Sequence, residues 1–190
     1  MNTKRMLRSL SLITVLALLL LGSTTTAVSA DSSTGTREWD VGGGTLCLVD
    51  PPGCPDVAMA DNGDTITIAG AGTLSLHPKS ITGSGTFLHQ DSAGNVLGSG
   101  TWTATQLMSF KSYGVAVPGT PFGDLEGGYA VIRIHLVAVS GAEFDGVLQV
   151  DCLLGNPPAG ANEGFRLAIQ GADLNFNKEV SGETLFVIPP

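Results

Sequence analysis

The sequence Gly70-Ala71-Gly72-Thr73-Leu74 follows a pattern, Gly-x-Gly-Thr and then a large apolar residue, that recurs along the first half of the chain. Related copies lie at Gly42–Leu46, Gly83–Phe87 and Gly98–Trp102. Because side chains alternate across a β-strand, each copy places two glycines and the apolar residue on one face and Thr on the other. Glycines on an inner face let a sheet bend sharply or let another layer approach closely. The pattern therefore predicts consecutive strands of a curved sheet or closed barrel.

Glycine and proline also interrupt the rest of the chain at short intervals. It contains 26 Gly and 10 Pro, and no window of ten residues or more carries a helical apolar stripe. Short runs rich in Thr, Val, Ile, Leu and aromatic residues lie between the Gly and Pro clusters, as expected for strands joined by turns. The predicted fold class is all-β, a single antiparallel β-barrel or β-sandwich of about eight to ten short strands, with the barrel slightly preferred.

Two hairpins are predicted in detail. The first joins Gly83–Gln90 to Asn95–Gln106, with a turn at Asp91–Gly94 that contains Asp and Gly at suitable positions. The second joins Tyr129–Val139 to Phe144–Leu153. Both hairpins connect segments that show the alternation of a strand, so antiparallel neighbours are expected at each.

The register of the second hairpin follows from matching its apolar and polar faces. Ile134 is expected opposite Val150, and Arg133 opposite Asp151, because a slip by one residue would bury Arg133 against Val150. In the same register Leu136 faces Leu148 and His135 faces Gln149.

The first thirty residues have the three parts of a secretory signal. Basic residues stand near the start, an apolar run covers Leu10–Leu21, and small residues precede Ala30. The apolar run is short for a membrane span. We therefore expect residues 1–30 to be a signal peptide, 31–40 a polar lead-in that Trp39 docks onto the domain, and 41–190 a single all-β domain.

Removal of the signal makes the chain strongly acidic. Three of the nine Lys and Arg residues lie in it, so the remainder carries six basic against 17 acidic side chains, a formal charge of −11. Such a surface repels phosphate backbones and anionic lipid heads. Nucleic acids and membranes are poor candidate partners, whereas a small apolar or neutral ligand fits the composition. An extracellular location is expected.

The three cysteines are Cys47, Cys54 and Cys152. The oxidising compartment expected after export permits disulfides. Pro51-Pro52-Gly53 can turn the chain so that Cys47 meets Cys54, with Cys152 left as a buried thiol. A bridge from Cys152 to either of the others is the alternative that the sequence leaves open.

The best polar constellation is predicted on the polar face of the second hairpin. It consists of Arg133, His135, Gln149 and Asp151. If that face lined a barrel interior, His135 could act as a general base, Arg133 could hold a carboxylate and Asp151 could orient either one. The alternative is a solvated face with a cross-strand Arg–Asp pair of small energetic value.

A weaker pattern resembles the opening of a calcium-binding loop. Asp173, Asn175 and Asn177 supply oxygens at alternate positions, but Lys178 stands where the loop requires Gly and Thr184 where it requires Glu. Only a looser cation site remains as a candidate. No metal or other cofactor is expected.

No nucleophile motif such as G-x-S-x-G is present, so catalysis is not the favoured function. The first hypothesis is a secreted, non-catalytic binding or structural β module. The alternative is a small-molecule-binding barrel, a carrier or an isomerase- or cyclase-type enzyme, whose interior would hold a cavity of roughly a few hundred Å³. A third hypothesis, a self-associating surface protein, rests on exposed strand edges with few lysines.

Overall fold

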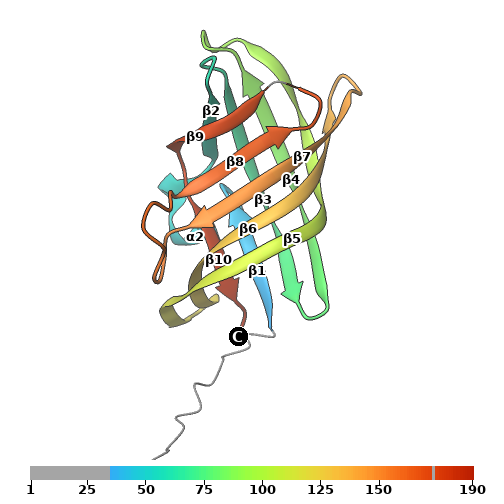
Figure 1. Ribbon diagram of the computed structural model, residues 1–190. Coiled ribbons are helices and arrows are strands. Elements are labelled where there is room, and N and C mark those ends of the chain that lie inside the picture. Colours follow the sequence, from blue (N-terminus) through green and yellow to red (C-terminus); the bar gives the residue numbers. More distant parts are fainter. Residues whose placement is uncertain (1–34, 173) are drawn as a thin grey trace, which may run out of the picture. The chain divides into compact units, whose positions relative to one another are not determined.

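The computed structural model describes residues 35–172 and 174–190, and strands account for most of them (Figure 1). The predicted signal peptide and the start of the lead-in lie outside the described residues. The elements are β1 (Thr36–Val41), α2 (Leu46–Val49), the 3₁₀ turn η1 (Pro51–Gly53), β2 (Asp56–Ala60), β3 (Thr65–Leu76), β4 (Lys79–Gln90), β5 (Val96–Thr120), β6 (Gly123–Ala138), β7 (Glu143–Cys152), β8 (Gly164–Ile169), β9 (Asn175–Ser181) and β10 (Thr184–Ile188).

The described strands form one antiparallel sheet of ten, which closes partly into a ring. Its order is β1-β10-β6-β5-β4-β3-β2-β9-β8-β7, and additional pairings join β1 to β3 and β6 to β7. Both β3 and β6 therefore pair with different partners along their lengths. The predicted all-β class and strand number are confirmed, and the arrangement is compatible with a barrel or a sandwich.

The glycine pattern works as predicted in three of its four copies, which lie in β3, β4 and β5. The apolar residues of these copies, Leu74, Phe87 and Trp102, are all buried. The inner glycines leave room for two indoles. A Cβ on Gly70 would lie 2.2 Å from Cζ2 of Trp102, and a Cβ on Gly83 would lie 2.5 Å from Cζ2 of Trp39.

The two indole rings pack against each other in the middle of the interior. The ring centroids of Trp39 and Trp102 lie 5.6 Å apart, and both side chains are fully buried. Trp39 Nε1 donates a hydrogen bond to the carbonyl oxygen of Thr82 at 3.1 Å. The glycines of β3 and β4 therefore give up side-chain volume and make room for two large aromatic residues.

Two local expectations need correction. The copy at Gly42–Leu46 is not a strand: Gly42 and Gly44 have φ of 51° and 62°, and the chain turns into α2. The predicted lead-in also overlaps a strand, because Thr36–Val41 forms β1. Alternate side chains of β1 face the core, so a strand buries more apolar surface there than a docked tail would.

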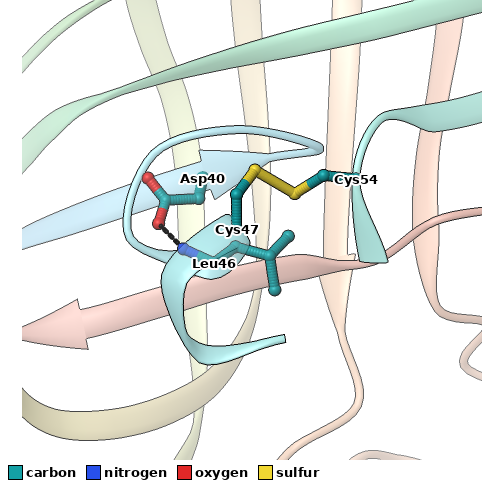
Figure 2. The surroundings of a disulfide bond; sticks show 4 residues. All are labelled: Asp40, Leu46, Cys47 and Cys54. Atoms are coloured by element: carbon teal, nitrogen blue, oxygen red, sulfur yellow. Dashed lines mark hydrogen bonds between the residues drawn. A yellow bond between two sulfur atoms is a disulfide. The ribbon is translucent and has the colours of Figure 1, made fainter. Parts of the chain in front are cut away.

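The loop after β1 is held by the predicted disulfide. Cys47 and Cys54 are bonded, and the Asp40 carboxylate accepts a hydrogen bond from the Leu46 N–H at 2.9 Å (Figure 2). Burial raises the pKa of Asp40 to about 6. On the outer side of the sheet, Leu46 packs with Leu125, Leu185 and Val187 in a second, smaller apolar cluster.

Both predicted hairpins are present, but the register of the second is corrected. In β6 and β7, Ile134 faces Gly146 and His135 faces Asp145, while Ile132 faces Leu148. The chain reverses within Val139–Ala142, where Ala138 and Ala142 are already hydrogen-bonded, so the turn lies earlier in the chain than expected. The displacement is an even number of residues, which leaves the inner and outer faces as predicted.

Among the described residues, no helix has the length and apolar character needed to cross a bilayer.

Candidate functional site

Four turns gather at one end of the ring, the upper end in Figure 1, and position the residues of the candidate site. They are the turns β2–β3, β4–β5, β6–β7 and β8–β9. In the β3–β4 ladder Ile66 faces His89. Asp64 precedes Ile66 by two residues on the same face, so it is the diagonal neighbour of His89 across the ladder.

The β2–β3 turn fixes Asp64 through its backbone. The Asp64 carbonyl accepts a hydrogen bond from the Ala60 N–H at 2.8 Å, and the Asp64 N–H donates to the Asn62 side chain at 3.0 Å. Gly63 has φ of 88°, a conformation that favours glycine. Residues 61–64 thus form a turn, and its last residue contributes to the site.

His89 is held on two sides. Its Nε2 lies 3.2 Å from Oδ2 of Asp64, and its ring meets the ring of Phe176 edge to face at a centroid distance of 5.3 Å. The side chains of His89 and Asp64 are 22% and 14% exposed. The imidazole therefore has one orientation and remains in contact with solvent.

An apolar pocket of about 220 Å³ lies beside this histidine. Apart from His89, it is lined by apolar side chains from β3, β4, β6, β7, β8, β9 and the β8–β9 connection: Ile66, Phe87, Leu136, Phe144, Ile169, Ala172, Leu174 and Phe176. Phe144 is 43% exposed, whereas Ile66, Leu136 and Phe176 belong to the buried core. The pocket is thus an opening of the core to solvent at one end of the ring.

A buried carboxyl group lies further along β2. Asp56 is fully buried, and neither of its carboxyl oxygens has a hydrogen-bond partner among the described residues. Burial, and then the nearby Glu179 carboxylate, raise the pKa of Asp56 to about 9. Burial also raises the pKa of Glu179, to about 7. Burial and the nearby Glu179 carboxylate therefore favour the protonated form of Asp56.

The sequence-predicted constellation is divided between two places. Arg133 and His135 lie together on the outer face and line a polar concavity of about 470 Å³. There His135 Nδ1 lies 3.0 Å from Asp145 Oδ1, a partner supplied by the corrected register. His135 and Asp145 are 37% and 67% exposed, so their contact is largely solvated.

Gln149 and Asp151 lie elsewhere on β7 and have tyrosine partners. The Tyr129 hydroxyl donates to Gln149 at 2.7 Å, and the Tyr113 hydroxyl donates to Asp151 at 3.1 Å. Burial and the Asp151 carboxylate raise the pKa of Tyr113 to about 12. The four candidate residues therefore do not form one site.

The cation candidates are only partly described. Asp173 lies outside the described residues, and Asn175 and Asn177 are exposed. Nearby, Lys178 Nζ lies 3.0 Å from Asp61 Oδ1. Within residues 35–172 and 174–190, no group of three or more His, Cys, Asp or Glu side chains is arranged to hold a metal ion.

Cys152 is the free cysteine of the described residues and is buried. Burial raises its thiol pKa to about 12. Because the thiolate is the reactive form, this side chain is unsuited to nucleophilic chemistry.

The His89–Asp64 pair was not predicted from the sequence, although a signal for it exists. A tight turn at His77-Pro78 pairs Leu76 with Lys79, and counting back along both strands brings Ile66 opposite His89. Asp64 then falls next to the imidazole on the same face. The pairing of β3 with β4, rather than any local motif, carries this information.

No protein-family model, curated protein or solved structure matches this chain.

Proposed function

We propose that this chain is an exported, non-catalytic binding protein whose ligand is a small apolar molecule held in the pocket beside His89. The observation that carries the proposal is the apolar opening at one end of an otherwise packed interior. Trp39 and Trp102 fill the part of the interior where they lie, because the inner glycines make room for both indoles. The packing of these two rings therefore does not require an open pocket.

The size and lining of the pocket support a small ligand. An engineered apolar cavity of about 150 Å³ binds benzene, and the present pocket measures about 220 Å³. Ligand sites are mostly apolar with a few placed polar groups. Here eight apolar side chains surround one histidine, which is the arrangement expected for an apolar molecule rather than a sugar or a charged metabolite.

Export is supported by the signal pattern of residues 1–30 and by the Cys47–Cys54 disulfide, since such bonds persist in oxidising compartments. The strongly acidic composition of the remaining chain disfavours nucleic-acid partners. Expression of the full chain in a bacterial host, followed by mass spectrometry of the periplasmic product, tests this part. A product that begins after Ala30 supports export, and an unprocessed cytoplasmic product contradicts it.

Binding is tested by titrating toluene into the protein and following methyl resonances by NMR. We expect saturable shifts confined to residues around the pocket. Ile169→Trp, which places an indole in the pocket volume, should weaken toluene binding at least tenfold. Val137→Trp, on the outward face of β6, serves as the matched control and should leave binding unchanged. Absence of saturable binding to the unaltered protein would refute the proposal.

A further inference from the structure

Among the described residues that line the pocket, His89 is the one polar side chain. One of its two ring nitrogens already has a partner. A carboxylate oxygen only accepts hydrogen bonds, so His89 Nε2 carries the proton and donates to Asp64 at 3.2 Å. The neutral ring then presents Nδ1 as an acceptor. Among the described residues, no hydrogen-bond partner is recorded for this Nδ1 atom.

Because His89 lines the pocket, a ligand that fills the pocket lies against the imidazole. The other described side chains of the lining are apolar, so none of them can replace water that the ligand displaces from the imidazole. A polar group left without a partner on binding lowers affinity, whereas a ligand that donates a hydrogen bond restores the contact. The site therefore favours an apolar molecule that carries one hydrogen-bond donor.

The apolar part of the ligand is expected to be a ring. Phe87, Phe144 and Phe176 all line the pocket, and His89 already meets Phe176 edge to face. Aromatic rings prefer such edge-to-face and offset contacts with one another. The volume of about 220 Å³ exceeds the roughly 150 Å³ that accommodates benzene, which leaves room for a substituent.

We infer that the pocket selects phenols: the aromatic ring lies among the phenylalanine side chains and the hydroxyl donates its hydrogen bond to Nδ1 of His89. Asp64 acts as a positioning residue, because its hydrogen bond to Nε2 sets the tautomer that makes Nδ1 an acceptor. This inference rests on the proposed function, since it specifies the ligand of the same pocket.

The test compares p-cresol with toluene, which differ by one hydroxyl group. We expect the unaltered protein to bind p-cresol at least tenfold more tightly than toluene in calorimetric or NMR titrations. In His89→Phe the preference should reverse, because the phenol hydroxyl then loses water without gaining a partner. The readout is the ratio of the two affinities, because His89 lines the pocket and its replacement can alter both.

Asp64→Asn tests the positioning role. An amide no longer enforces one tautomer, so the ratio of p-cresol to toluene affinity should fall at least threefold. A purely structural role for Asp64 would change both affinities by the same factor and leave the ratio unchanged, which would overturn this part.

A ligand-side measurement keeps the test independent of whether the variants fold. The unaltered protein should bind p-cresol at least tenfold more tightly than 4-methylanisole, which retains the oxygen but cannot donate. If toluene binds and p-cresol shows no advantage over toluene, the phenol inference is wrong and the apolar pocket stands. If neither binds, the proposed function itself fails.

Discussion

The two ends of the interior hold their polar side-chain pairs in different ways. At one end, the closed end, Arg37 Nε donates to Glu126 Oε2 at 2.7 Å, and both side chains are almost fully buried. At the other, the open end, His89 and Asp64 form a longer contact beside the apolar pocket and remain partly exposed. Arg37 pairs near one end of β3 and Asp64 precedes the other.

At the closed end every charged group has several partners. Ser112 donates a hydrogen bond to Glu126, and the Arg37 guanidinium also donates to the Gly35 carbonyl and stacks over Phe110 at 5.5 Å. Phe110 in turn packs edge to face on Phe186. Such saturation is what a buried ion pair requires, because each charge has lost its water.

At the open end, Nδ1 of His89 can still accept a hydrogen bond from a bound molecule. The inner face of the sheet therefore has a different role at each end. Satisfied polar groups and large aromatic residues hold the closed end together, whereas an incompletely satisfied histidine at the open end is available to a ligand.

The largest expected effect comes from breaking the buried pair. Glu126→Ala leaves the Arg37 charge without its carboxylate, which should lower the free energy of unfolding by about 3–5 kcal/mol. Asp64→Ala at the open end should cost less than about 1 kcal/mol, because solvent reaches that pair. Urea denaturation followed by tryptophan fluorescence measures both. Equal losses at the two ends would contradict the comparison.

A double replacement separates pairing from packing at the closed end. Arg37→Met combined with Glu126→Leu removes both charges and keeps apolar volume, so we expect it to recover most of the stability that Glu126→Ala loses.

A second contrast concerns aromatic packing. Phe186 is fully buried and Phe144 is 43% exposed. Phe186→Ala should lower the free energy of unfolding by about 3–5 kcal/mol, as for other buried aromatic residues, whereas Phe144→Ala should cost under about 1 kcal/mol. Phe144→Ala should nevertheless weaken toluene binding. A fully packed open end would instead give similar losses for the two variants in the same denaturation assay.

Of the main effects, the smallest is expected from Asp56, a buried carboxyl that, unlike Glu126, has no cationic partner among the described residues. Its folded-state pKa of about 9 lies above the ordinary value of 3.8, so the folded protein retains a proton that the unfolded chain releases. Its contribution to stability is complete below about pH 4 and is lost as the pH rises towards 9. At pH 8, Asp56→Asn should therefore raise the free energy of unfolding by roughly 1–3 kcal/mol relative to the unaltered protein. A higher melting temperature reports this gain.

The control for this prediction is the pH dependence itself. The difference in melting temperature between Asp56→Asn and the unaltered protein should shrink as the pH is lowered from 8 to 4. A difference that is independent of pH would show that Asp56 does not titrate in this range. Glu126→Gln should lower the melting temperature at both pH 8 and pH 4. At pH 8 this effect has the opposite sign to that of Asp56→Asn.

Much of the fold could be predicted from the sequence because alternation is a local property. The buried faces of β6 and β7 were assigned correctly, as were the β4–β5 hairpin and the Cys47–Cys54 disulfide. The strand at Thr36–Val41 was not predicted. Its inward residues are Arg37, Trp39 and Val41, and the charged Arg37 breaks the apolar alternation that indicates a strand. Arg37 is tolerated there only because Glu126 arrives from a distant strand.

The candidate site was less predictable for a related reason. The constellation of Arg133, His135, Gln149 and Asp151 assumed a register in which Ile134 faces Val150, but Ile134 faces Gly146. Matching faces determines a register only to within an even number of residues, and the length of the turn selects among the remaining choices. His135 consequently meets Asp145 rather than Gln149.

The amino-acid order established which side chains face inward, because the two-residue period of a strand depends only on neighbours along the chain. It also specified the glycines that admit Trp39 and Trp102. Which inward residues meet was settled by ring closure and turn length, which act between segments far apart in the chain. The His89–Asp64 pair, 25 residues apart, and the apolar opening beside it exist because four turns lie at the same end of the ring.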